Sequence, residues 1–77
     1  MKLSELQQGD KAIIQSILSG EELKSRLYSF GVARGSELYV EACSVGKYNL
    51  AIVVDDTVIG LRSSEASQIM VSMSKHN

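Results

Sequence analysis

Residues 18–35 have the sequence LSGEELKSRLYSFGVARG, which predicts one α-helix between segments that favour strands. Ser19 and Glu22 form an S-x-x-E capping box, in which each side chain accepts a hydrogen bond from the backbone N–H of the other residue. At the opposite end, Gly31 can adopt the left-handed conformation that closes a helix. We therefore expect a helix over about residues 20–30.

Hydrophobic residues at both ends of this helix indicate how it is anchored. Leu18 and Leu23 occupy the positions of a hydrophobic staple, and Val32 can fold back on Leu27. Leu23, Leu27 and Phe30 form one apolar stripe. Because a helix of about ten residues is marginal alone in water, we expect it to pack on the sheet that its neighbours form.

The flanking sequence predicts five short strands with short connections. The strand-forming segments are 11–17, 37–43, 49–54, 57–61 and 69–73. Residues 63–68 can form a short helical turn before the last strand. Because closure removes exposed strand edges, we expect a small, mainly β barrel with one inserted helix.

Three local features refine this barrel. The isoleucines of the first strand do not keep strict alternation, which predicts a bulge or a strong bend. Asp55-Asp56 predicts a tight two-residue hairpin. The third strand is apolar on both faces, with Ala51 and Val53 on its outer side. We expect the helix to cover that outer face and to leave some apolar surface exposed.

Candidate metal ligands are few. The predicted faces of the second strand are Leu38, Val40 and Ala42 on one side and Glu37, Tyr39, Glu41 and Cys43 on the other. Glu41 and Cys43 thus share a face, and Asp55 and Asp56 are adjacent at a turn. Carboxylates and thiolates can hold ferrous iron, so these four residues are weak metal candidates. Without paired histidines, C-x-x-C or a ligand-spaced loop, we interpret them as a solvated turn and a charged face.

The sequence predicts no catalytic site. Cys43 and His76 are the only residues of their types, and His76 lies in a predicted frayed tail over about residues 73–77. No glycine motif for phosphate binding occurs. The lone cysteine excludes an intramolecular disulfide and fits a reducing compartment. We expect a non-enzymatic protein that uses no cofactor.

Size and charge narrow the function further. The 77 residues suffice for one domain, 1–77, and the formal net charge of −1 is a poor match to a general nucleic-acid binder. Another hypothesis is RNA binding, with bases stacked on Tyr28, Tyr39 and Tyr48. The small number of basic residues around these tyrosines argues against it. The longest apolar run, 50–54, is far short of a membrane span. We expect a soluble, cytoplasmic protein whose surplus apolar surface binds protein, with homo-oligomers possible through an edge strand.

Glycines and apolar residues follow a characteristic order along the chain. They are Leu3 and Leu6 before Gly9, Ala12-Ile13-Ile14 and Ile17, Arg26-Leu27-Tyr28-Ser29-Phe30-Gly31-Val32, Gly35 before Val40, Gly46, Ile59-Gly60-Leu61-Arg62, Glu65-Ala66 and Ile69-Met70-Val71. This order resembles the FeoA family from Leu3 to about Val71. The chain departs from that family at Arg34, where proline is frequent, and at Phe30, where leucine is usual.

FeoA proteins are SH3-like barrels that accompany FeoB, a membrane ferrous-iron permease. The resemblance implies a five-stranded SH3-like barrel that acts as an accessory or adaptor protein of bacterial ferrous iron uptake. It implies that Leu27, Tyr28 and Arg34 face the cytoplasmic side of a FeoB-type permease, although Leu27 also suits the core. No nucleic acid and no direct membrane insertion are expected. The alternative is a metal-sensing module related to the C-terminal domain of iron-dependent repressors.

Overall fold

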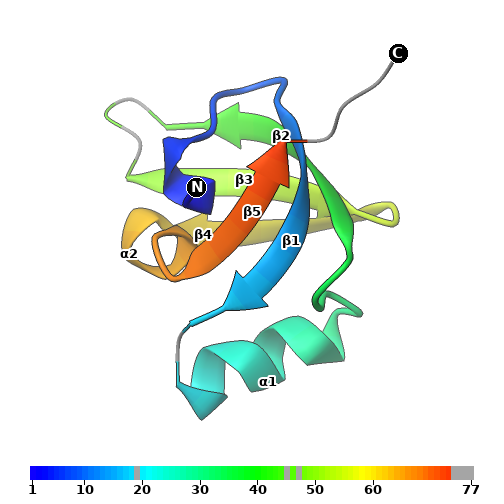
Figure 1. The fold of residues 1–77 in the computed structure, drawn as a ribbon. Helices are drawn as coiled ribbons and strands as arrows, with labels where there is room; N and C mark the ends of the chain where they lie inside the picture. The colour runs from blue at the N-terminus through cyan, green and yellow to red at the C-terminus, as the bar shows by residue number, and fades with distance from the viewer. Residues whose placement is uncertain (19, 45, 47, 74–77) are drawn as a thin grey trace.

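Five antiparallel strands form one sheet that curls into a barrel (Figure 1). The strands are β1 (Lys11–Ile17), β2 (Glu37–Cys43), β3 (Asn49–Val54), β4 (Thr57–Arg62) and β5 (Ile69–Met73), in the spatial order β4-β3-β2-β1-β5. The computed structural model describes residues 1–18, 20–44, 46 and 48–73. The predicted mainly β architecture and its five strands are confirmed. Ser19 and the predicted tail beyond Met73, including His76, lie outside the described residues.

Three short helical segments complete the fold of the described residues. They are the 3-10 turn η1 (Leu3–Glu5), α1 (Glu21–Ser29) and α2 (Ser63–Ala66), and α2 confirms the predicted helical turn. In η1 and α2 a glutamate of the first turn accepts the backbone N–H three residues before it. Lys2 N–H donates to Glu5 Oε1 at 2.6 Å, and Arg62 N–H donates to Glu65 Oε1 at 2.9 Å. Each carboxylate thus satisfies a donor that the helix itself leaves unpaired.

One apolar core fills the barrel and receives side chains from every strand. Its largest fully buried members are Leu3, Leu6, Ile14, Leu27, Val32, Leu38, Val40, Ile52, Val54, Leu61, Ile69 and Val71. Within the described part of the chain, no polar or charged residue is buried. Stability therefore rests on apolar burial, with hydrogen bonds confined to the backbone and the surface.

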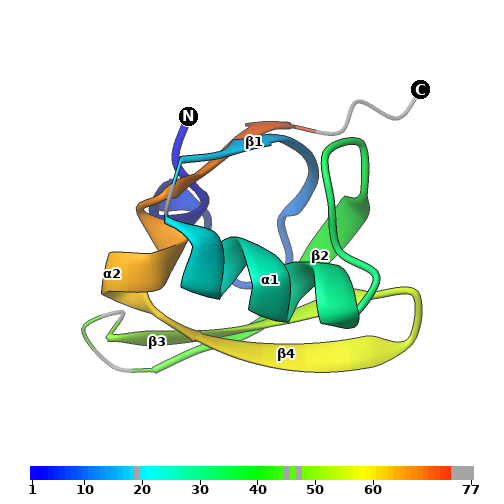
Figure 2. The same ribbon diagram turned by 90° about the horizontal axis from the view of Figure 1, so that it is seen from below.

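Helix α1 lies across one end of the barrel (Figure 2). Its Leu23 and Leu27 are 8% and 0% exposed and belong to the same core as the inner face of β3. The predicted cover over the outer face of β3 is therefore wrong, and Ala51 and Val53 remain half-buried there. The two leucines instead shield inner side chains at the barrel mouth, which would otherwise meet water.

Two bulges adjust which residues face the core. In β1 the register against β5 shifts between Ile14 and Ser16, which confirms the predicted irregularity. In β2 a second shift lies between Val40 and Ala42, where clean alternation had been expected. Ala42 is exposed and Cys43 packs against the core, the reverse of the predicted faces. The extra residue of a bulge reverses the orientation of every side chain after it.

The start of α1 differs from the prediction. The residue before the first turn is Gly20, and it makes no side-chain capping hydrogen bond. The predicted capping box depends on Ser19, which lies outside the described residues. Leu18 is 64% exposed, so the predicted staple with Leu23 is wrong. Glu21 and Glu22 in the first turn interact favourably with the positive end of the helix dipole. The capping-box prediction did not include this effect.

The end of α1 matches the prediction. Gly31 has a φ of +82°, and its N–H donates to the Tyr28 carbonyl at 2.9 Å. Val32 N–H donates to the Leu27 carbonyl at 2.9 Å, which completes a Schellman motif. Leu27 and Val32 are both 0% exposed and belong to one core, as the predicted fold-back requires. Phe30, expected in the buried stripe, is 46% exposed because the chain leaves the helix at this residue.

The β3–β4 hairpin turns at Asp55 and Asp56, as predicted. Their φ angles are +48° and +68°, and Val54 pairs with Thr57 on either side. Two consecutive left-handed residues define a type I′ turn, whose twist matches that of the strands. Aspartate tolerates this conformation better than most residues do.

Replacing Gly31 with alanine should lower the free energy of unfolding by about 1–2 kcal/mol, because the left-handed conformation strains a residue with a Cβ. A Cβ at Gly31 would meet no heavy atom within 4 Å, so the loss measures backbone conformation alone. Gly60→Ala is the matched control, since its Cβ is also unobstructed and its φ is not left-handed. Urea denaturation of both variants checks this. Equal stability of the two variants would contradict the assignment.

Candidate functional site

The four candidate metal ligands do not come together. Glu41 is exposed, whereas Cys43 is half-buried against the core beyond the β2 bulge, so the prediction that they share a face is wrong. Cys43 pairs with Leu50 at one end of β3, and Asp55 follows the other end, about 16 Å away along the strand. No group of three or more Asp, Glu, Cys or His residues suited to a metal occurs within the described residues.

Of the three residues predicted to contact a partner, two are accessible. Tyr28 is 56% exposed, and Arg34 is exposed on the turn that follows α1. Leu27 is 0% exposed, so its side chain belongs to the core and is not available to a partner. Phe30 joins the accessible pair at 46% exposure. We name Tyr28, Phe30 and Arg34 the helix-end surface.

The turn that carries Arg34 is fixed to β1. Ser36 N–H donates to the Ala33 carbonyl at 3.0 Å, and Ala33 N–H donates to Ser36 Oγ at 3.0 Å. Gly35 N–H donates to the Ile14 carbonyl at 2.8 Å, and Ile14 N–H donates to the Ser36 carbonyl at 2.9 Å. Gly35 has a φ of +92° and Arg34 does not have a positive φ, so the turn is type II. Arg34 therefore projects from a constrained backbone.

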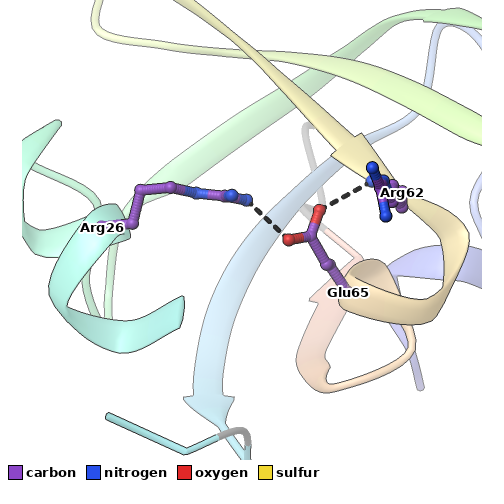
Figure 3. Close-up of polar contacts among 3 residues, drawn as sticks. All are labelled: Arg26, Arg62 and Glu65. Carbon is purple, nitrogen blue, oxygen red and sulfur yellow. Dashed lines mark hydrogen bonds and ion pairs between the residues drawn. The ribbon is translucent and has the colours of Figure 1, made fainter. Parts of the chain in front are cut away.

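An ion pair connects α1 to α2 (Figure 3). Arg26 Nη2 lies 2.9 Å from Glu65 Oε2, while the other carboxylate oxygen accepts the Arg62 N–H. The Arg26 and Glu65 side chains are 45% and 26% exposed, so the pair is largely solvated. The ion pair therefore contributes little to the free energy of folding, and its main effect is to orient α1 at the barrel mouth.

The pKa of Glu65 lies below its ordinary value of 4.5. The main cause is the hydrogen bond from the Arg62 N–H, which stabilises the carboxylate. Partial burial acts in the opposite direction, and the charge and hydrogen bond of Arg26 lower the pKa further. Glu65 is thus a charged, structural residue at neutral pH.

The helix-end surface suits contact with another protein. It combines two aromatic side chains with one guanidinium, the residue types that most often dominate interface free energies. Phe30 was expected in the core because it lies seven residues after Leu23, on the apolar stripe that an uninterrupted helix would have. The sequence signal for the exposure of Phe30 is Gly31, because a helix ends at the residue before a left-handed glycine.

No helix among the described residues has both the length and the apolar composition needed to cross a bilayer.

Sequence comparison connects the chain to ferrous iron transport proteins. The FeoA domain model matches residues 1–73. A curated protein of Campylobacter jejuni, provisionally named Fe(2+) transport protein A, is 37% identical over 73 residues, which cover 95% of this chain and 99% of that protein.

Solved structures share the fold. The FeoA protein of Chlorobium tepidum is 28% identical, with a TM-score of 0.92 over 100% of this chain and 73% of that one. The zinc-bound FeoA of Stenotrophomonas maltophilia, described as a prokaryotic SH3 domain protein, is 32% identical, with a TM-score of 0.80 over 94% and 89%. The SH3-like class is thereby confirmed. A manganese-dependent repressor at 21% identity, with a TM-score of 0.83 over 97% and 41%, shares the fold alone.

Stability should fall in acid through Glu65. Because its folded-state pKa is lowered, its contribution is present above pH 4.5, the ordinary value, and is lost as the pH falls through the folded-state pKa. At pH 7, Glu65→Gln should lower the free energy of unfolding by about 1 kcal/mol, and the difference from wild type should shrink in acid. Arg26→Gln is the control, because it removes the ion pair but keeps the Arg62 N–H bond, and it should cost less. Urea titrations across pH test this, and a pH-independent difference would refute it.

Proposed function

This chain belongs to the FeoA family, and on that premise we propose that it is a non-enzymatic accessory protein of bacterial ferrous iron uptake. The match over residues 1–73 is the observation that carries the proposal. The Campylobacter relative, named for Fe(2+) transport, supports the same role. Residues 1–77 act as one domain in the cytoplasm. The protein works by contact with a FeoB-type permease at its cytoplasmic side.

The helix-end surface is the part of the molecule that we assign to this contact. Tyr28 and Phe30 are 56% and 46% exposed at the end of α1, and Arg34 follows on the constrained turn. Because the turn is fixed to β1 and the helix end is fixed by the Schellman motif, little backbone conformational entropy is lost when a partner binds. Tyrosine and arginine side chains often contribute most of the binding free energy when they are buried at an interface.

A metal-sensing role has weaker support. The likeness to a manganese-dependent repressor extends to the fold alone. Asp55 and Asp56 lie in the β3–β4 turn, away from Cys43 at the other end of β3, and Glu41 and Cys43 do not share a face, so the four residues do not form a common ligand set. We therefore retain the adaptor role and do not assign ligands to these residues.

Tyr28→Ala and Arg34→Glu should each weaken binding to a FeoB-type permease by about tenfold or more, because each removes an exposed anchor. Co-purification with the detergent-solubilised permease measures this. Tyr48→Ala is the matched control for tyrosine, since Tyr48 is 73% exposed outside the helix-end surface, and Lys2→Glu is the control for charge. If the permease retained all four variants equally, the assignment of the helix-end surface to this contact would be wrong. Normal ferrous uptake in cells that lack the protein would overturn the function.

Arg34→Pro should separate binding from folding. Arg34 is the second residue of a type II turn, where proline is favoured. Its N–H donates no hydrogen bond within the described residues, so the substitution should raise the free energy of unfolding by about 0.4–1 kcal/mol. The guanidinium is lost, so permease binding should weaken as in Arg34→Glu. Thermal denaturation and co-purification of the same preparation test both effects. A stable variant with full binding would exclude Arg34 from the contact.

A further inference from the structure

Strand β4 is an edge of the sheet with a free side. Within the residues that the structure describes, its only strand partner is β3, because β4 stands at one end of the strand order. It runs along the rim of the molecule (Figure 2). Val58 on this strand is 59% exposed.

The backbone groups that point away from β3 can be identified. Because Asp55 and Asp56 form a two-residue turn, Val54 and Thr57 are a hydrogen-bonded pair, and such pairs then alternate along the hairpin. Ile59 and Leu61 therefore bond to β3, whereas Val58, Gly60 and Arg62 direct their N–H and C=O groups outward. Two contacts agree with this alternation. Ser63 N–H reaches the Tyr48 carbonyl on the β3 side at 2.8 Å, and Arg62 N–H points outward to Glu65 at 2.9 Å.

The outward backbone groups of Val58 and Gly60 remain unpaired. No hydrogen bond to them occurs within the described part of the chain. The outward N–H of Arg62 is already occupied by Glu65, so the free edge is short and has a defined end. An antiparallel partner strand that matches it must offer two hydrogen-bonding residues in the same alternating arrangement.

The side chains along this edge match those of the same edge in a second copy of the chain. Val58, Gly60 and Arg62 are alternate residues on the outer face of β4, and Asp56, in the turn just before the strand, carries the charge opposite to that of Arg62. An antiparallel copy related by a two-fold axis at Ile59 places Val58 opposite Gly60 and Arg62 opposite Asp56, twice by symmetry. All four of these residues are exposed.

Gly60 has no role within a single copy that requires glycine. A Cβ at this position would meet no heavy atom within 4 Å, and its φ is not left-handed. Glycine inside a strand costs about 0.5–1 kcal/mol relative to alanine and often marks the close approach of another backbone. Opposite Val58 of a second copy, it leaves space for the branched side chain.

We propose that β4 pairs with β4 of a second copy of this chain, which joins the two sheets across a two-fold axis at Ile59. The free N–H and C=O groups of Val58 and Gly60 bond to each other across the axis, and Arg62 of each copy pairs with Asp56 of the other. This inference does not depend on the proposed function, because it concerns the purified chain alone.

Charge-reversal substitutions at the two residues that pair across the two-fold axis test the proposal. Sedimentation equilibrium of the wild type should show a reversible dimer at up to millimolar concentration. Arg62→Glu and Asp56→Lys should each raise the dimer dissociation constant by about tenfold to a hundredfold, because both symmetric pairs become repulsive. An equimolar mixture of the two variants should restore dimers, since the carboxylate introduced at position 62 then faces the ammonium introduced at position 56. Circular dichroism verifies that each variant is folded.

Arg34→Glu, which lies on the helix-end surface, should leave dimerisation unchanged and thereby separates the two interfaces. Amide hydrogen exchange of the wild type provides a second measurement, with protection at Val58 and Gly60 that rises with protein concentration. A monomeric wild type, a dimer that both variants leave intact, or a mixture without recovery would each overturn the proposal.

Discussion

The hydrogen bond from Val32 N–H to the Leu27 carbonyl, at 2.9 Å, is the contact on which the proposed function depends. It forms because Gly31 adopts a left-handed conformation, and it brings two fully buried side chains together at the barrel mouth. The same reversal directs Phe30 outward and leads the chain into the turn that carries Arg34. One glycine thus connects the core to the surface that we assign to a partner.

Among the described residues, the short helix α1 is held without a hydrophobic staple. Helix α1 has nine residues, too few to be stable alone in water. Two leucines in the common core, the Schellman motif and the ion pair to Glu65 compensate. Since the ion pair is solvated, apolar burial carries most of the free energy, and the charges mainly select one orientation.

Much of this structure follows from local sequence patterns, and the errors have physical causes. The strands, the Asp55-Asp56 turn and the end of α1 each have a signal within a few residues. The bulge in β2 has no such signal, because it arises from pairing with β3, and it invalidated the predicted faces of Ala42 and Cys43. The docking of α1 also depends on how the whole sheet curls. For the candidate site, residue type predicted Tyr28 and Arg34 but could not separate buried Leu27 from exposed Phe30.

The central claim is that the helix end is where this protein meets its permease. Nuclear magnetic resonance cross-saturation between an unlabelled FeoB-type permease in detergent and the isotope-labelled chain tests it residue by residue. We predict loss of amide signal concentrated at residues 28–34, with the β2–β3 loop unaffected. Saturation confined to other surfaces, or no transfer at concentrations where the proteins co-purify, would contradict the account.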